Sequence, residues 1–371
     1  MERALARSRD RQPAAAPTRR RIRLMIVDDS VVARAVLSRM VETDPAFEIA
    51  AVAASAEDAI DALGECRVDV VVLDLEMPGA GGLKSIPRIL AAGAGAKVMI
   101  VSSLAEDGAE HTVAALALGA ADTMPKPGTG RFNGKFSEIL VSKLKALGYA
   151  TRDAAAGGYA SQAKGPQPPL RAMPADPIGI LAIGASTGGI HALGALFGAL
   201  PRPIGVPILV TQHLPMPFMP VFARQLGTIA HRTAVVAEDG QPLLADHIYV
   251  APGDAHLTLE PAKDGPIVRL THGRSSSGCM PSVDPMLASV GAIYGDQALG
   301  VVLTGMGRDG VEGASTLVSC GGSVIAQDEA SCAVWGMPRA ILEAGLASAI
   351  LPPDKIARRI AGRTQELREC K

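Results

Sequence analysis

Polar side chains stand at the ends of four predicted strands in the first third of the sequence. In a parallel sheet the carboxyl ends of the strands meet along one edge, so these side chains should gather there. A single acid in such a position often only caps the following helix, but five polar residues at four strand ends favour one pocket. They are Asp28 and Asp29 after residues 22–27, Asp74 after 68–73, Ser102 at the end of 97–102, and Lys126 after 121–124.

This set of groups is suited to phosphoryl chemistry. Three carboxylates close together repel one another and need a hard cation, and Mg²⁺ binds a few carboxylates while bridging to phosphate. A carboxylate can also attack phosphorus and become an aspartyl-phosphate. The Lys126 ammonium supplies a positive charge for phosphoryl oxygens, and the Ser102 hydroxyl can hydrogen-bond them. The first part of the chain therefore predicts a magnesium-dependent phosphoacceptor.

A second site is predicted around Ser186. Residues 183–189 are Ile-Gly-Ala-Ser-Thr-Gly-Gly, which contain the pattern G-x-S-x-G and join a strand to a helix. Such a turn lifts a serine hydroxyl clear of the sheet, and the N–H groups at the helix start can stabilise a developing oxyanion. The same glycines could instead hold a nucleotide pyrophosphate. The fingerprint G-x-G-x-x-G and the P-loop lysine are both missing, which counts against a nucleotide.

A serine nucleophile needs a base and an acid that orients the base. His213 follows the next predicted strand, and Asp309 follows the strand at 298–303, so both stand where a parallel sheet collects site residues. His256 competes for the role of base at the start of a hairpin strand. Weaker candidates, none of which ends a predicted core strand, are His191, His247 and His272.

Strand and helix patterns alternate through residues 22–147 and again through 177–352. Alternation of this kind predicts parallel sheets covered by helices on both faces. We therefore expect an α/β protein of two domains, a five-stranded parallel doubly wound sheet and then a mainly parallel sheet with a hairpin at 256–271. The glycine- and proline-rich residues 148–176 predict a linker, and residues 353–371 predict a C-terminal tail.

Composition limits the class of protein. The 371 residues are 48% apolar and 20% charged, which fits a soluble globular chain of two or three domains. The first 23 residues hold eight arginines against two acids, and the rest of the chain carries 28 basic against 35 acidic side chains. This acidic body argues against nucleic-acid binding, where clustered lysine and arginine are expected. We interpret residues 1–21 as a disordered basic extension, with an Arg-rich transit peptide as the weaker alternative.

The five cysteines are scattered along the chain and form no C-x-x-C pair. This spacing argues against a disulfide framework and against a zinc site, and it favours reduced thiols. No apolar run reaches the roughly 18 residues of a membrane span, and the N-terminus does not have the pattern of a secretory signal. We therefore expect a cytoplasmic protein without membrane insertion. The cysteines are Cys66, Cys279, Cys320, Cys332 and Cys370.

Residues 22–147 resemble the receiver domain of response regulators in two-component signalling. The resemblance rests on the polar residues at the strand ends and on the sequence Leu-Asp-Leu-Glu-Met-Pro at 73–78. It implies that Asp74 is the phosphoacceptor, and that Ser102 and Lys126 are the switch hydroxyl and the phosphate-sensing lysine. The segment 79–82 lacks the bulkier residues and the Asp-Gly end that are usual in the family, which favours a more flexible loop. The implied Mg²⁺ ligands are Asp28, Asp29, Asp74 and the carbonyl of Glu76.

Six short segments of the second region resemble the CheB family of chemotaxis protein-glutamate methylesterases, which are also protein-glutamine glutaminases. The resemblance implies that Ser186 is the nucleophile, His213 the general base and Asp309 its orienting partner. It also places Thr187 and Met306 at the active site, where their backbone N–H groups are candidates for an oxyanion hole. Cys279 and Met280 depart from members that carry a basic residue there. The segments are 184–189, 212–215, 251–254, 281–284, 303–310 and 327–330.

The resemblance implies a reaction and its partners. The substrate would be a γ-glutamyl methyl ester on the cytoplasmic helices of methyl-accepting chemoreceptors, and selected glutamines would be deamidated at the same site without a cofactor. The linker and the tandem of two complete sites suggest regulation, in which phosphoryl transfer from a CheA-type histidine kinase to Asp74 would release a receiver that restricts access to the esterase site. Two alternatives stay open, namely a C-terminal domain that only binds a partner, and a nucleotide-binding oxidoreductase that uses the turn at 184–189.

Overall fold

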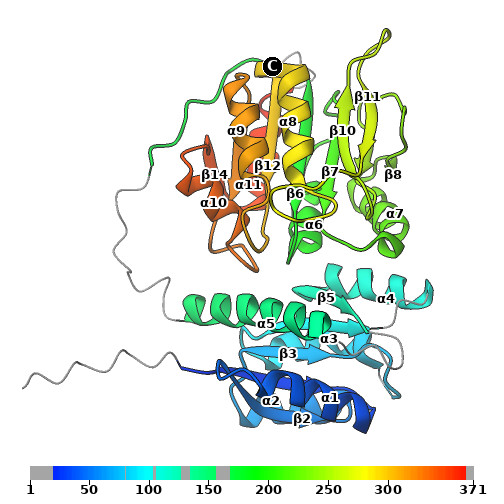
Figure 1. Ribbon diagram of the computed structural model, residues 1–371, viewed down its shortest axis with the longest axis vertical. Helices are drawn as coiled ribbons and strands as arrows, with labels where there is room; N and C mark the ends of the chain where they lie inside the picture. The colour runs from blue at the N-terminus through cyan, green and yellow to red at the C-terminus, as the bar shows by residue number, and fades with distance from the viewer. Residues whose placement is uncertain (1–19, 80, 103–105, 127–133, 156–167, 365–371) are drawn as a thin grey trace, which may run out of the picture.

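Two α/β domains follow one another along the chain (Figure 1). Most of the predicted basic extension, the middle of the predicted linker and the end of the predicted tail lie outside the residues that the structure describes. No described helix is long and apolar enough to cross a membrane. The computed structural model describes residues 20–79, 81–102, 106–126, 134–155 and 168–364.

The first domain is the predicted five-stranded parallel sheet, in the order β2-β1-β3-β4-β5. Its central strands are continuous apolar runs because helices cover both faces. Helices α1 and α5 pack on one face, and α2, α3 and α4 pack side by side on the other. The elements are β1 (Ile22–Val27), α1 (Val31–Glu42), β2 (Phe47–Ala53), α2 (Ala56–Glu65), β3 (Val70–Leu73), α3 (Gly81–Ala92), β4 (Lys97–Ser102), α4 (Glu106–Ala117), β5 (Asp122–Pro125) and α5 (Gly134–Ala155).

Helix α5 extends to Ala155, past the end at residue 147 that the sequence predicted. Gly148 indicated the start of a linker, but it is a packing position inside the helix. A Cβ at Gly148 would lie 2.4 Å from the Ile22 side chain, so only glycine lets α5 cross β1 this closely. The Thr151 hydroxyl lies 3.1 Å from the carbonyl oxygen of Asp69 and helps to hold the last turns against the sheet. The predicted linker therefore begins inside a helix of the first domain.

The second domain has a seven-stranded sheet in the order β14-β13-β12-β6-β7-β9-β8, and all its described pairings are parallel. Strands β10 and β11 form the predicted antiparallel hairpin. Helices α6, α7 and α11 cover one face, while α8, α9, α10 and the hairpin cover the other. The strands are β6 (Ile180–Ala185), β7 (Ile208–Gln212), β8 (Ala234–Val236), β9 (Ile248–Val250), β10 (His256–Glu260), β11 (Ile267–Thr271), β12 (Ala298–Val302), β13 (Ser323–Gln327) and β14 (Ala349–Leu351).

Two helices of this domain were not predicted. Helix α8 begins after Ser282, whose side chain accepts a hydrogen bond from the Asp284 N–H and caps the helix. Helix α11 lies within the predicted C-terminal tail but buries Ile356 and Ile360 against α6, so this part of the tail belongs to the domain core. The helices are α6 (Gly189–Ala199), α7 (Met219–Ala230), α8 (Val283–Tyr294), α9 (Val311–Ser319), α10 (Met337–Glu343) and α11 (Pro353–Ala361), with short 3₁₀ turns η1 (Met216–Phe218) and η2 (Gly295–Gln297).

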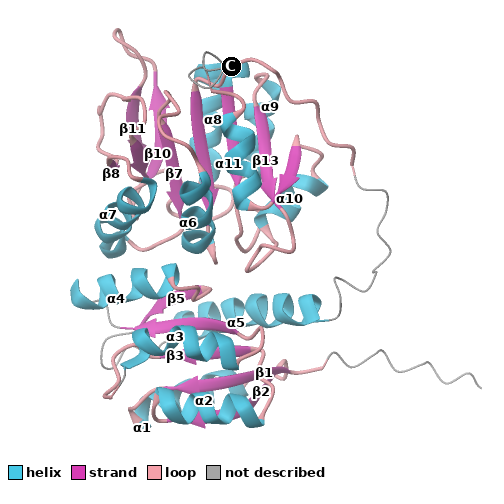
Figure 2. Cartoon of the chain, turned by 180° about the vertical axis from the view of Figure 1, so that it is seen from behind, coloured by secondary structure: helices cyan, strands magenta, loops and turns pink. Residues whose placement is uncertain are grey.

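The first domain contacts the second through α4, through the residues that lead into β5, and near Val334, which joins the apolar cluster of β4 and α5. Helix α4 packs against α6, α7 and η1, as the view in Figure 2 also shows. One buried apolar cluster runs from α3 and α4 into α6 and α7. Arg224 on α7 forms an ion pair of 2.6 Å with Glu110 on α4 at the exposed rim. The start of β5 is thereby held against the carboxyl ends of β6 and β7.

Candidate active site and phosphoacceptor site

Sheet topology brings the predicted serine, histidine and aspartate together. Strand β6 lies between β7 and β12, and the chain leaves these three neighbours at their carboxyl ends. Ser186 follows β6, His213 follows β7 and Asp309 stands in the loop after β12. This is the point in an open parallel sheet where a crevice forms, because the connections on either side of β6 run in opposite directions.

The three side chains form a continuous hydrogen-bonded chain. The Nδ1 atom of His213 lies 3.1 Å from the Ser186 Oγ, and its Nε2 atom lies 2.7 Å from the Asp309 Oδ2. A neutral imidazole that donates from Nε2 to the carboxylate leaves Nδ1 as the acceptor for the serine proton. The arrangement is therefore that of a nucleophile, a base and an acid that orients the base.

Glycines let the backbone around Ser186 approach its neighbours closely. Gly188 has φ +77°, in the left-handed region that favours glycine, and it caps the start of α6. A Cβ at Gly189 would lie 2.2 Å from the Gln212 Oε1, and one at Gly305 would lie 2.7 Å from the Ser186 Cβ. Gln212 in turn donates from Nε2 to the Ser186 carbonyl at 2.9 Å. The G-x-S-x-G turn is thus fixed from both sides.

Asp309 is held by groups that the sequence analysis did not single out. The Ser282 hydroxyl donates to its Oδ1 at 2.6 Å, and the Val283 N–H donates to its Oδ2 at 2.7 Å. Both donors stand at the N-terminus of α8, where backbone N–H groups are free to bind an anion. Residues 281–284 could have indicated the start of this helix, because a serine before an apolar run with an acid in the first turn is typical of a helix N-terminus.

His256, which the sequence made a competitor for the role of base, does not bond to Ser186. Its Nδ1 accepts a hydrogen bond of 2.9 Å from the Ser282 N–H, and its Nε2 lies 2.8 Å from the Gly273 carbonyl. Both ring nitrogens are therefore engaged away from Ser186, and His256 supports the segment that holds Asp309. The other predicted candidates lie elsewhere: His191 is exposed on α6, and His247 and His272 bond to the carbonyls of Ala245 and Asp254.

Neighbouring charges set the protonation of these groups. Burial lowers the pKa of His213, but the hydrogen bonds and charges of Asp309 and Cys279 outweigh it and raise the pKa to about 9. Burial would raise the pKa of Asp309, but the hydrogen bond and charge of His213 hold it well below its ordinary value. Burial and the charge of Asp309 raise the pKa of Asp284 to about 6. Asp309 is consequently the ionised partner that stabilises a charged His213.

Residues of the first domain cover Ser186. The Thr187 hydroxyl donates to the Asp122 Oδ2 at 2.6 Å, and the Gly188 N–H donates to the Ala121 carbonyl at 2.6 Å. The cavity left between these segments and His213 measures about 10 Å³, which is about enough for one water molecule. A glutamyl ester does not fit in this space. The oxyanion roles of the Thr187 and Met306 N–H groups stay predictions, and Met306 is partly exposed.

The predicted phosphoacceptor residues also converge. Carboxylate oxygens of Asp28, Asp29 and Asp74 lie within 4.8 Å of one another, a donor set that fits a hard cation such as Mg²⁺. The Lys126 Nζ lies 2.7 Å from the Asp74 Oδ2 and 2.8 Å from the Asp28 Oδ2. The Ser102 hydroxyl is buried without a hydrogen-bond partner among the described residues. An unsatisfied hydroxyl at the same edge of the sheet as these carboxylates fits a site that receives a phosphoryl group.

The pKa values here follow from burial and from Lys126. Burial raises the pKa of Asp74, although the hydrogen bond from Lys126 opposes this. Burial lowers the pKa of Lys126, but the hydrogen bonds to Asp28 and Asp74 outweigh it and raise the pKa above its ordinary value. The Glu76 N–H donates to the Asp74 Oδ1 at 3.2 Å, while the role of the Glu76 carbonyl as a metal ligand stays a prediction.

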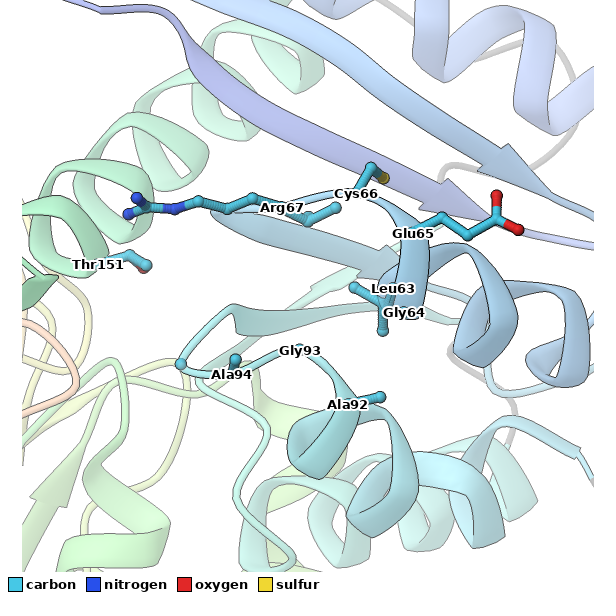
Figure 3. A pocket seen from close by; sticks show the side chains of 11 residues that line it. Leu63, Gly64, Glu65, Cys66, Arg67, Ala92, Gly93, Ala94 and Thr151 are labelled. Carbon is cyan, nitrogen blue, oxygen red and sulfur yellow. The ribbon is translucent and has the colours of Figure 1, made fainter.

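A cavity of about 680 Å³ lies at the other end of the receiver sheet. It is bordered by Cys66 and Arg67 before β3, by Gly93 and Ala94 before β4, and by Thr151 on α5. Figure 3 shows the Arg67 side chain reaching toward Thr151. This cavity lies at the amino ends of the strands, and none of the predicted site residues lines it. The predicted site residues stand instead at the carboxyl ends of the strands.

Both domains of this chain are similar to known protein families. The model of the response regulator receiver domain matches residues 24–131, and the model of the CheB methylesterase domain matches residues 181–360. A protein of Caulobacter vibrioides named protein-glutamate methylesterase/protein-glutamine glutaminase 2 is 42% identical over 352 residues, which are 93% of this chain and 100% of that protein. The chain belongs to the CheB methylesterase family.

Other relatives carry the same description. Proteins of Rhodospirillum rubrum and Paramagnetospirillum magneticum, each named protein-glutamate methylesterase/protein-glutamine glutaminase 1, are 41% and 38% identical to this CheB family member over 91% of its length, and 93% and 94% of their own lengths are covered. Among solved structures, the catalytic domain of the Thermotoga maritima CheB methylesterase aligns with 50% of this chain and 97% of its own, at 36% identity and a TM-score of 0.48. The predicted order of a receiver before a CheB domain is confirmed.

Proposed function

We propose that this protein is a phosphorylation-regulated serine hydrolase that removes methyl esters from glutamates of chemoreceptors and deamidates selected receptor glutamines. The observation that carries the proposal is the hydrogen-bonded chain from Ser186 through His213 to Asp309 at the switch point of the sheet. The relatives named protein-glutamate methylesterase/protein-glutamine glutaminase support this substrate class. Since the substrate helices lie on the cytoplasmic side, the protein would act in the cytoplasm.

Ester cleavage would begin at Ser186. Its hydroxyl attacks the ester carbonyl carbon while the Nδ1 of neutral His213 takes the proton, and the tetrahedral oxyanion collapses as methanol leaves with that proton. A water molecule then attacks the acyl-enzyme through the same base, which frees the glutamate and Ser186. Asp309 keeps the imidazole oriented and stabilises its charged form. Amide hydrolysis of glutamine passes through the same kind of oxyanion and releases ammonia instead.

The receiver would control this site. Asp74 would accept the phosphoryl group from a CheA-type histidine kinase, and Mg²⁺ held by Asp28, Asp29 and Asp74 would neutralise negative charge there. Lys126 would turn to the phosphoryl oxygens, since it already bonds to Asp74. The unphosphorylated receiver contacts the nucleophile turn through Ala121 and Asp122 and leaves a cavity of about 10 Å³ between this contact and Ser186, so separation of the two domains would widen access. Phosphorylation would therefore shift the population toward an open arrangement.

A serine-reactive phosphonate and a Ser186→Ala variant test the esterase. Wild-type protein activated by a phosphodonor and Mg²⁺ should be labelled and should release methanol from methylated receptor membranes, while Ser186→Ala treated in the same way should be unlabelled and slower by about 10³-fold or more. Ser315→Ala is the matched control because Ser315 is exposed on α9, away from the site. Normal turnover in Ser186→Ala would overturn the assignment.

The geometry does not favour the two alternatives. A domain that only binds a partner has no need for a serine, a base and a buried acid in one hydrogen-bonded chain. An oxidoreductase would need room for a nucleotide at the turn 184–189, where Gly189 and Gln212 are already in close contact. Neither alternative predicts covalent labelling of Ser186.

A further inference from the structure

A thiol lies beside the proposed triad. The Cys279 Sγ, a ring nitrogen of His213 and a carboxylate oxygen of Asp309 all lie within 4.8 Å of one another. The sequence argued against zinc because it has no C-x-x-C pair, but here the ligand types come from three separate loops after β7, β11 and β12.

We propose that His213, Cys279 and Asp309 form an inhibitory binding site for Zn²⁺. Imidazole nitrogen, thiolate sulfur and carboxylate oxygen are the three ligand types that Zn²⁺ takes in proteins. Asp309 lies at the Nε2 of His213, so the ion would bind that nitrogen, and three protein ligands leave a fourth position for water. The inhibitory part of this inference rests on the proposed function, whereas the binding part does not.

The distances fit with small side-chain movements. Zn–S of about 2.3 Å and Zn–N or Zn–O of about 2.0–2.2 Å place the ligand atoms of a tetrahedral site roughly 3.3–3.6 Å apart. The three atoms are no farther than 4.8 Å apart now. Cys279 lies in the loop between β11 and α8 and is only half-buried, so rotation of its side chain can close the difference.

Charge and support also fit a dication. A thiolate and a carboxylate balance the two positive charges of Zn²⁺ while His213 binds as the neutral ring. The thiol proton and the Nε2 proton of His213 leave to solvent, and a charged ring keeps its second proton on Nδ1. Asp309 is already fixed by the Ser282 hydroxyl and the Val283 N–H, and such outer hydrogen bonds orient metal ligands. The receiver cluster of Asp28, Asp29 and Asp74 offers oxygen alone and so suits Mg²⁺ rather than a thiophilic ion.

Binding would stop the esterase directly. A metal ion between the His213 Nε2 and Asp309 breaks the bond that orients the ring, and it leaves the ring proton on Nδ1, so Nδ1 can no longer accept the Ser186 proton. Zn²⁺ should therefore lower both methanol release and phosphonate labelling of Ser186, and a chelator should restore both.

Cobalt spectroscopy on the full-length protein tests the binding without any enzymatic readout. With Mg²⁺ in excess to fill the receiver site, Co²⁺ should produce the near-ultraviolet band of sulfur-to-cobalt charge transfer, and Zn²⁺ should abolish it by displacement. Cys279→Ser should lose the band, whereas Cys320→Ser should keep it because Cys320 is exposed on the far side of α9 from the triad. No band in the wild-type protein, or a band that persists in Cys279→Ser, would overturn the site.

A second measurement tests the inhibition. Loss of one of three ligands should raise the Zn²⁺ concentration for half-inhibition by at least about 10–100-fold in Cys279→Ser, with no such change in Cys320→Ser. Labelling of metal-free Cys279→Ser by the phosphonate shows that its triad is folded. Equal Zn²⁺ sensitivity of the two variants would overturn the inhibitory role, and an absence of labelling in metal-free wild-type protein would instead overturn the proposed function.

Discussion

The protonation of His213 depends on residues from separate loops. Asp309 and Cys279 both face the ring and together raise its pKa to about 9 against the effect of burial. A protonated ring has no lone pair for the Ser186 proton. At neutral pH most of the enzyme would then hold its base in the inactive form.

The pH profile tests this directly. Because activity needs neutral His213, kcat/KM of the phosphodonor-activated protein should rise with pH and reach half its maximum at about 9. Cys279→Ser removes one of the causes that raise the pKa, so its midpoint should move to lower pH. Initial rates of methanol release between acidic and alkaline pH, corrected for spontaneous hydrolysis, measure both midpoints. Identical midpoints in the two proteins would contradict the role assigned to Cys279.

Single residues could be predicted where the local pattern carried the signal. Ser186, His213 and Asp309 each follow an apolar strand, so their convergence could be predicted from sheet geometry alone. Cys279 could not be placed beside His213 in this way, because it stands in a long loop with no periodic pattern. The contact between Asp122 and Thr187 joins two domains, and a local pattern holds no information on how domains dock.

Helix ends are decided by packing as much as by composition. Gly148 lies in α5 against Ile22, a fully buried residue of β1. Gly148→Ala should destabilise the receiver by about 1–3 kcal/mol, although alanine is the better helix former, because the new methyl group overlaps the Ile22 side chain. The midpoint of urea unfolding measures the change.

Gly64 on α2 provides the matched control, since a Cβ there would meet nothing within 4 Å. Gly64→Ala should stabilise the same domain by about 0.5–1 kcal/mol through helix propensity. Equal effects of the two substitutions would show that α5 does not pack on β1 as described.

Strands and most helices of both sheets could be predicted from their apolar patterns, but three features could not. Gly148 indicated a linker although it packs inside α5, so the end of this helix was not recognised. Helix α8 was not recognised because it begins directly after a loop motif. Helix α11 was hidden because its apolar residues Ile356, Ala357 and Ile360 are few and follow two prolines. In each case the partner surface lies far away in the sequence.

At the scale of the whole molecule, the contact between Asp122 and Thr187 lies next to Ser186 and joins the two domains. Asp122 accepts the Thr187 hydroxyl and also binds Lys143 at 2.7 Å, so one side chain links α5, β5 and the nucleophile turn. Lys126 lies just beyond β5 and bonds to Asp74. The phosphoacceptor and the esterase contact are thus joined by a single short strand.

Weakening this contact should raise activity without a phosphodonor. A hydrogen bond to a charged group contributes about 1.5–3 kcal/mol, so Asp122→Asn should increase basal methanol release by about tenfold or more. Asp61→Asn, an exposed change on α2, should have no effect. An unchanged basal rate in Asp122→Asn, with donor activation intact, would mean that this contact does not restrict access.

Asp74→Asn should abolish the response of the esterase to a phosphodonor. It removes the phosphoacceptor but leaves the triad untouched, so basal methanol release should persist while a small-molecule phosphodonor has no effect. Full induction of Asp74→Asn by the donor would exclude Asp74 as the phosphoacceptor.

Methanol release from methylated receptor membranes, with and without a phosphodonor and Mg²⁺, tests the central claim most directly. We expect a low rate of methanol release from the unphosphorylated protein, in which the receiver leaves a cavity of about 10 Å³ next to Ser186. The rate should rise clearly when the donor is added. If the rate of release does not change when the donor is added, the assignment of the triad would stand, but control by the receiver would be contradicted. An absence of release under both conditions would contradict the assignment as an esterase.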